Sequence, residues 1–411
     1  MAMPKPKYLV CVNPKYNNNK KYELIPIDSY NFKAVWSRIA DESDPIYGED
    51  SKVYPAYMWK IKYAEKIAKG YRDISHIHYG KDGTEAGKTT VKMKSEYKEI
   101  ENKDVNDVVS YLLSCSRQIV AKSYTVTTAQ VTEEMIKEGR RLLSVLGKRK
   151  TVDAFNKVLV KLFTAIPRRM GRVSDFLVRS ASEFSDKIDY ETNLLDILES
   201  QCDIDKKTVA DKKDGEKTIL QAYGVHMWPA TDKQLTEIKE RLSDGMRKRL
   251  RKAYRVINDR TQKTFDDYLK AEKIKTVKMM FHGSRDENWL SIMLKGLSLN
   301  PDAVITGKMF GHGLYFSPDA DKSWGYTSGY GTRWAHGNKS VAYLGLFALA
   351  YGKPYNVYNG ADTGLNESRF KALHPGCNCL HAHGGQNLRK DEVIVYSEKA
   401  ETICYLLEMD A

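Results

Sequence analysis

The chain has 411 residues, 42% of them hydrophobic and 29% charged, which is typical of a folded globular protein with about two to four domains. No run of about 18 apolar residues is present, and no apolar core follows the N-terminal lysines, so we expect neither a membrane span nor a secretory signal. Six scattered cysteines exclude a disulfide framework and favour an intracellular location, nuclear in a eukaryotic host and cytoplasmic in a bacterial or viral setting.

The formal net charge of +13 favours a polyanionic partner such as nucleic acid, although a merely soluble basic protein could carry the same charge. Basic clusters occur at 167–172 and 247–252, and each is equally consistent with a solvated helix face. Charge alone therefore does not decide the partner.

Residues 1–80 are predicted to be rich in strands, because aromatic and β-branched runs such as "KYLVCV" and "FKAVWSRI" alternate with polar turns. Within the same segment, residues 56–70, "AYMWKIKYAEKIAKG", predict a helix that ends near Gly70, where a C-terminal glycine belongs. Residues 81–104 are polar and dotted with glycine, which predicts a linker.

Residues 105–205 carry apolar side chains at three- and four-residue spacing and predict a small helical bundle. One of its helices begins after threonine capping signals and ends at Gly147. The charged stretch 205–217 is interpreted as a second linker. Short β-type runs mixed with a few helices then predict an α+β domain over 220–411.

Three fragments of this last domain occur in a specific order. "FHGS" carries His282 and Gly283, "GLYFSPDADKSWGY" carries Tyr315 and Ser323, and "RKDEVIVY" carries Glu392. Together they resemble the His-Tyr-Glu signature of the poly(ADP-ribose) polymerase catalytic domain, and the resemblance covers roughly residues 220–411. The implied activity is transfer of ADP-ribose from NAD⁺, which serves as substrate.

The resemblance implies how the donor is held. The backbone of Gly283 and the hydroxyl of Ser323 would bond the nicotinamide carboxamide. Tyr326 would stack on the nicotinamide ring, with Tyr315 on its other side. A cationic pyridinium suits aromatic faces through stacking and cation–π attraction.

The same resemblance implies that His282 and Asn288 contact ribose hydroxyls, that Glu392 is the catalytic carboxylate, and that Lys322 lies beside the acceptor. This chemistry fits the residue types. Cleavage of the glycosidic bond builds positive charge on the ribose, as in glycoside hydrolysis, and a carboxylate stabilises that charge most where it is greatest.

The donor loop departs from the family pattern. Ser298 stands where many relatives have arginine, and the loop is about one residue short. A separate stretch, "HPGCNCLHAHGG" (residues 374–385), resembles a metal site in composition, but its spacing is not that of a standard zinc pair. We interpret it as a loop that lines NAD⁺, and no metal is expected.

The front of the chain resembles the WGR domain of DNA-dependent members of the family, with Trp36 and Arg38 kept and Ser37 in place of glycine. The resemblance implies that Trp36 stacks on an end nucleotide and that Arg38 reaches phosphate or an interdomain partner. Trp36 could equally be a core aromatic residue. The segment 105–205 would correspond to the family's regulatory helical domain, in a member of the family without zinc fingers.

The expected fold is therefore multidomain, with a WGR-like domain over 1–80, helices over 105–205 and a catalytic domain over 220–411. The expected function is poly(ADP-ribose) synthesis stimulated by DNA nicks or ends, acting on proteins including the enzyme itself. An accessory factor for acceptor choice is left open, and no membrane partner is expected. The alternatives are a mono-ADP-ribosyltransferase and a DNA-end-binding scaffold with an inactive domain.

Overall fold

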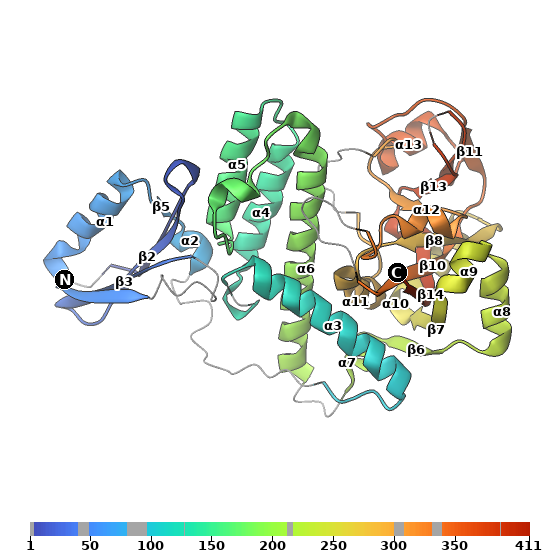
Figure 1. Ribbon diagram of the computed structural model, residues 1–411, viewed down its shortest axis with the longest axis horizontal. Coiled ribbons are helices and arrows are strands. Elements are labelled where there is room, and N and C mark those ends of the chain that lie inside the picture. The colour runs from blue at the N-terminus through green and yellow to red at the C-terminus, as the bar shows by residue number, and fades with distance from the viewer. Residues whose placement is uncertain are drawn as a thin grey trace. The chain divides into compact units, whose positions relative to one another are not determined.

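The computed structural model describes residues 4–39, 49–79, 97–126, 128–211, 217–299, 308–330, 339–386 and 388–411, so most of the predicted first linker and of the donor loop lie outside the described residues. The chain is a multidomain α+β protein (Figure 1) that divides into two compact units. Among the described residues, none of the helices is both long and apolar enough to cross a membrane.

The N-terminal residues form an antiparallel sheet with the strand order β4-β3-β2-β1-β5, as the predicted strand content requires. Its strands are β1 (Lys7–Asn13), β2 (Asn18–Pro26), β3 (Asn31–Arg38), β4 (Asp50–Pro55) and β5 (Arg72–Asp73). Leu9, Leu24 and Phe32 are fully buried and pack with Trp59 of helix α1 (Trp59–Ala68). The predicted end of that helix is confirmed: Gly70 follows it with a φ of +85°. The short helix α2 spans Ser75–His78.

Helices dominate residues 103–211, as the apolar spacing predicts. They are α3 (Lys103–Ser123), α4 (Glu133–Leu146), α5 (Val152–Ala165) and α6 (Phe184–Asp211). The predicted caps of α4 are present, since the Thr132 hydroxyl accepts from the backbone N–H of Met135 and Gly147 follows the last turn. The predicted linker 205–217 is partly wrong, because α6 continues to Asp211.

Helices α4, α5 and α6 lie side by side within the first unit (Figure 1), and side-chain contacts hold them together. Arg140 of α4 pairs with Asp196 and Glu199 of α6, and Phe155 of α5 stacks on Phe184 at 4.2 Å between ring centroids. Arg168, only 2% exposed, donates to the carboxylate of Glu191 at 2.7 Å; Lys187 of α6 pairs with the same carboxylate at 2.8 Å. These charges are buried together, and each ion therefore depends on its partners.

The second unit contains two sheets. The five-stranded sheet has the order β6-β7-β14-β10-β8 and the four-stranded sheet has the order β11-β12-β13-β9. The strands are β6 (Val225–Pro229), β7 (Leu250–Asn258), β8 (Val277–Gly283), β9 (Leu314–Phe316), β10 (Val341–Ala350), β11 (Pro354–Val357), β12 (Cys379–Ala382), β13 (Glu392–Val395) and β14 (Glu401–Asp410).

The helices of this unit are short. They are α7 (Ile219–Ala222), α8 (Asp232–Glu240), α9 (Asp244–Arg249), α10 (Asp259–Ala271), α11 (Asp286–Lys295), α12 (Ala320–Trp324) and α13 (Glu367–Leu373). The first part of α3, residues 103–117, also belongs to this unit.

Strand β10 is an interior strand of the larger sheet, between β14 and β8. Nine of its ten residues are buried, and it pairs antiparallel with β8 on one side and β14 on the other. The smaller sheet meets β8 where Phe281 and Ser317 form an isolated bridge after β9. This arrangement brings the end of β8, the strand β9 and the start of β13 to one place, where the predicted site residues lie.

Candidate active site

His282 lies at the end of β8, opposite Gly345 of β10, and is partly buried. Its Nδ1 lies 2.9 Å from the backbone carbonyl oxygen of Tyr315. Because a carbonyl can only accept, Nδ1 carries the proton and Nε2 presents a lone pair. Burial lowers the pKa of His282 to about 4, so the ring is neutral at pH 7. The imidazole is therefore prepared to accept a hydrogen bond from a hydroxyl.

Gly283 is required by the close approach of α12. A Cβ at this position would lie 1.8 Å from the backbone oxygen of Ser323, which excludes any larger residue unless the helix moves. Ser323 is buried, and its hydroxyl donates to the carbonyl of Phe281 at 3.1 Å. The sequence interpretation assigned this glycine to ligand approach alone, and the packing of α12 against β8 is a second, independent reason.

Tyr315 lies in the middle of β9, opposite Ile394 of β13. Its hydroxyl donates to the carbonyl of Gly311 at 3.0 Å and accepts from the N–H of Phe310 at 3.1 Å, which fixes the ring from both sides. Burial raises the pKa of Tyr315 well above its ordinary value, so the phenol stays protonated. The ring position is thus set by its own loop.

The other glycines of this segment also have packing roles. Gly311 has a φ of +71°, and a Cβ there would lie 2.1 Å from the carbonyl oxygen of Leu365. A Cβ on Gly313 would lie 2.3 Å from the side chain of Ile394. The glycines therefore allow the loop before β9 to pack against β13 and the 365 segment.

Glu392 is the first residue of β13 and only 8% of it is exposed. The Nζ atom of Lys322 on α12 lies 2.9 Å from its Oε1 atom. Just before it, the hydroxyl of Ser317 donates to the backbone carbonyl of Asp391 at 2.7 Å. The carboxylate is thus held at the strand entry by an ion pair and by a fixed backbone.

The other residues predicted to contact NAD⁺ lie on α11 and after α12. Asn288 donates from Nδ2 to the hydroxyl of Ser284 at 3.0 Å. Tyr326 follows α12 and is 61% exposed, which leaves an aromatic face open to a ligand. Ser298 donates to the Glu398 carboxylate at 3.1 Å, while residues 300–307 of the donor loop lie outside the described residues.

The structure brings the predicted residues together in three connected pairs: His282 with Tyr315, Gly283 with Ser323, and Lys322 with Glu392. An additional network was not anticipated. The hydroxyl of Tyr111 on α3 donates to the buried carboxylate of Asp286 at 2.8 Å, and Lys339 pairs with the same oxygen at 3.2 Å. Asp286 begins α11 shortly after His282, and nothing in the amphipathic pattern of α3 marks Tyr111 for this contact.

The interpretation of the Cys/His stretch as a loop is partly wrong, because its middle residues form a strand. Residues Cys379–Ala382 form β12, which pairs parallel with β11 and antiparallel with β13. The strand alternates, and its two apolar side chains, Leu380 and Ala382, enter a core cluster. The alternation "CLHAH" was the signal that could have predicted it.

In the first unit, Trp36 and Arg38 both lie on β3. Trp36 is half-buried and stacks on Tyr22 with ring centroids 5.9 Å apart. Arg38 donates to the carbonyl oxygens of Asn17 at 2.6 Å and Gly171 at 2.8 Å. Ser37 between them is partly buried and faces Lys21 in the register of β2 and β3.

Comparison with known proteins identifies the second unit. Residues 233–411 match the family described as the poly(ADP-ribose) polymerase catalytic domain. A putative poly [ADP-ribose] polymerase-like protein, 100L of Invertebrate iridescent virus 6, is 27% identical over 163 residues, which is 38% of this chain and 84% of the relative.

Longer relatives are similar over smaller fractions of their length. Poly [ADP-ribose] polymerase of Sarcophaga peregrina is 25% identical over 317 residues, 70% of this chain but 27% of the relative. Poly [ADP-ribose] polymerase 2 of Homo sapiens is 47% identical over 49 residues, 12% of this chain and 8% of the relative. The chain thus carries a C-terminal poly(ADP-ribose) polymerase catalytic domain. The domain and these relatives support an ADP-ribosyltransferase activity that uses NAD⁺ as substrate.

Proposed function

We propose that the protein transfers ADP-ribose from NAD⁺ to protein side chains, releases nicotinamide, extends the product to poly(ADP-ribose), and is stimulated by DNA breaks. The observation that carries the proposal is the position of Glu392, a buried carboxylate at a strand entry beside Lys322 and next to the strand that holds Tyr315.

The chemistry follows from these groups. When the bond between nicotinamide nitrogen and ribose C1′ breaks, positive charge develops on the ribose ring. The Glu392 carboxylate bonds the ribose hydroxyl and stabilises that charge, which lowers the barrier rather than only binding the substrate. The acceptor hydroxyl then attacks C1′ and gives up its proton, and Glu392 orients it or accepts that proton.

The donor residues fit NAD⁺ chemically. The neutral His282 ring offers Nε2 to a ribose hydroxyl, since its Nδ1 is bound to the Tyr315 carbonyl. The exposed ring of Tyr326 offers a face to the flat nicotinamide, and Ser323 and the backbone of Gly283 lie beside it for the carboxamide. Asn288 supplies a further amide for the ribose.

Stimulation by DNA rests on the first unit. Lysines of helix α1 and strand β4 lie over aromatic rings of its sheet: Lys66 of α1 lies 4.0 Å from the ring centre of Tyr22, and Lys62 of α1 and Lys52 of β4 both lie over Tyr54. Phosphate neutralisation by lysine and stacking on exposed rings bind a DNA end without reading its sequence. In this proposal Trp36 takes part in end stacking. Arg38 positions the adjoining 167–173 segment through Gly171.

Regulation would be transmitted by α3. Residues 103–117 of this helix belong to the catalytic unit and the rest to the other unit, so one continuous element is shared. Its contact with the catalytic domain includes the Tyr111 bond to Asp286 and the ion pair of Lys252 with Asp104. Loosening of these contacts on DNA binding would release the donor site, an order–disorder switch.

The test is NAD⁺ consumption and product size with and without nicked DNA, for the wild type and for Glu392→Gln. The proposal predicts turnover that rises with DNA and long products that disappear in the variant, with turnover reduced about 10²–10³-fold. Trp36→Ala should remove the DNA response and keep basal turnover.

Other outcomes identify the alternatives. Single ADP-ribose units in the wild type would indicate a mono-ADP-ribosyltransferase. DNA binding without any NAD⁺ turnover would leave a DNA-end-binding scaffold. Turnover that ignores DNA would contradict the regulatory part of the proposal alone.

A further inference from the structure

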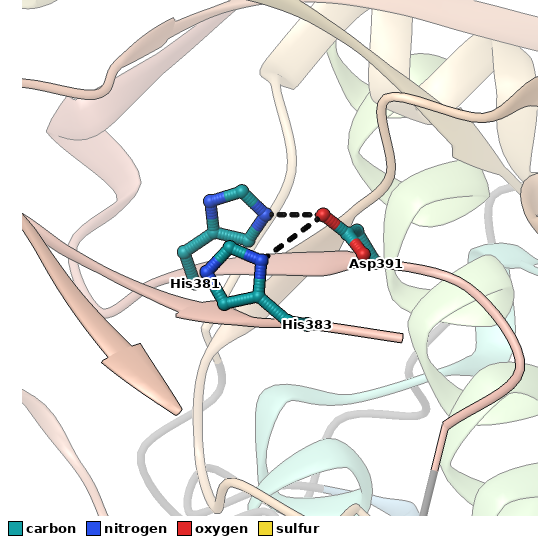
Figure 2. A group of neighbouring side chains, drawn as sticks. All are labelled: His381, His383 and Asp391. Atoms are coloured by element: carbon teal, nitrogen blue, oxygen red, sulfur yellow. Dashed lines mark hydrogen bonds and ion pairs between the residues drawn. The ribbon is translucent and has the colours of Figure 1, made fainter. Parts of the chain in front are cut away.

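Two histidines and an aspartate form a compact cluster just before the catalytic strand β13. His381 lies in β12 and His383 two residues later, so strand alternation directs both side chains to the same face (Figure 2). Asp391 precedes β13, and the antiparallel pairing of Ala382 with Glu392 brings it opposite the histidines. One potential ligand atom from each of the three residues lies within 4.8 Å of the others.

One ring nitrogen of each histidine approaches the same carboxylate oxygen of Asp391. Nε2 of His381 lies 2.8 Å and Nδ1 of His383 lies 3.4 Å from Oδ2 of Asp391. The two imidazole rings stack with centroids 4.1 Å apart. Figure 2 shows both rings beside the Asp391 carboxylate. Their nitrogen atoms therefore approach the carboxylate oxygen side by side.

The outer atoms of the same residues are each held by a hydrogen bond. Nδ1 of His381 lies 2.7 Å from the hydroxyl of Tyr351, and Nε2 of His383 lies 2.8 Å from Oδ1 of Asn356. The backbone N–H of Gly384 donates to Oδ1 of Asp391 at 2.7 Å. Outer hydrogen bonds of this kind orient imidazole and carboxylate ligands in metal sites.

The position of the proton on His383 decides which of its ring nitrogens can bind a metal. Since the amide oxygen of Asn356 accepts from Nε2 of His383, the proton sits on Nε2 and the Nδ1 lone pair faces the Asp391 carboxylate. Two acceptors that face each other repel unless a proton or a metal cation lies between them, and a metal ion can occupy this position.

We propose that His381, His383 and Asp391 bind one divalent transition-metal ion, with Zn²⁺ the best match to two imidazoles and one carboxylate. Zinc accepts nitrogen and oxygen ligands in this combination and takes water as its fourth ligand. The ion would join β12 to the residue before Glu392 and so fix the entry of the catalytic strand. This departs from the sequence-based expectation of no metal.

The Cys379 thiol is not a ligand. It donates to the backbone carbonyl of Tyr351 at 3.3 Å, whereas a thiol must lose its proton to bind zinc. Among the described residues, the cluster that could hold a metal contains two histidines and an aspartate and no cysteine. The Cys-x-Cys pattern is therefore not part of the proposed site.

The test is zinc binding by the full chain after removal of metal with a chelator. Calorimetric titration with Zn²⁺ should give one site per chain for the wild type. The site should be weakened at least about tenfold in His383→Ala and in Asp391→Asn. His226→Ala is the matched control, because His226 also pairs with a carboxylate, that of Asp259 at 3.1 Å, far from the cluster in sequence. It should bind like the wild type.

Cobalt distinguishes the ligands even if a variant fails to fold. The wild type loaded with Co²⁺ should show visible absorption of a nitrogen- and oxygen-ligated ion and no thiolate charge-transfer band. Zinc should also raise the melting temperature of the stripped wild type and not that of a folded Asp391→Asn variant. Absence of zinc binding by the folded wild type, unchanged affinity in both variants, or a thiolate band would each overturn the proposal. None of these measurements depends on transferase activity.

Discussion

The contact between β8 and α12 can be tested with a single added methyl group, because there is no room for one between the two elements. In Gly283→Ala the new Cβ would lie 1.8 Å from the oxygen and 2.8 Å from the carbonyl carbon of Ser323. Both atoms are backbone, so relief requires α12 to move as a body, and α12 carries Lys322 and Ser323.

Overpacking of this kind costs about 1–3 kcal/mol of unfolding free energy. At about 2–4 °C per kcal/mol for a unit of this size, the melting temperature should fall by roughly 2–12 °C. The displacement of Lys322 from Glu392 should also reduce NAD⁺ turnover, because a shift of about 1 Å in a positioning group costs about 10²-fold.

The assay is thermal and urea unfolding of the full chain, followed by tryptophan fluorescence and, in parallel, by residual NAD⁺ turnover. Gly325→Ala is the matched control. Gly325 caps the same helix at an ordinary φ of −60°, and its added Cβ would come no closer than 3.6 Å to the Lys322 carbonyl oxygen. That variant should stay within about 0.5 kcal/mol of the wild type. Equal melting temperatures and equal turnover for the two variants would refute the reasoning.

Three further predictions address regulation, pH and the first unit. Tyr111→Phe removes a hydrogen bond to the buried Asp286 carboxylate. The loss of about 1.4 kcal/mol of contact energy between α3 and α11 should raise DNA-independent NAD⁺ turnover about tenfold, whereas Tyr16→Phe at an exposed site should leave it unchanged. An unchanged basal rate in both variants would contradict the role of α3. Burial raises the pKa of Glu401 to about 8, so the folded state binds this proton more tightly than the unfolded state, and the free energy of unfolding falls as pH rises from about 4.5 to 8. Between pH 6 and 9 the wild type should lose on the order of 2–3 kcal/mol more than Glu401→Gln in urea unfolding. Parallel pH profiles for the two proteins would disprove this. Glu191→Gln removes the carboxylate that the buried Arg168 and Lys187 share, and should lower the free energy of unfolding in urea by about 3–5 kcal/mol. Glu133→Gln is the control: its pair with Lys137 is exposed, so the loss should be at most about 0.5 kcal/mol.

Local sequence determined most of the secondary structure and indicated the candidate site residues. Helix α4 begins at Thr132 and ends before Gly147 because capping is a matter of a few adjacent residues. The motif order from His282 through Tyr315 to Glu392 indicated the catalytic domain because each motif is short and its chemistry needs those residue types. The strands that carry them were visible as aromatic and β-branched runs.

Tertiary structure decided what depends on residues far apart in the chain. The bond from Tyr111 to Asp286 joins positions 175 residues apart, and no local pattern specifies it. The reason for Gly283 became apparent only when the Ser323 carbonyl was found against it. The histidines of the Cys/His stretch acquired a common direction only because β12 forms and pairs with β13, which brings Asp391 to them. Local propensity acts between neighbours, whereas such contacts depend on how the sheets assemble.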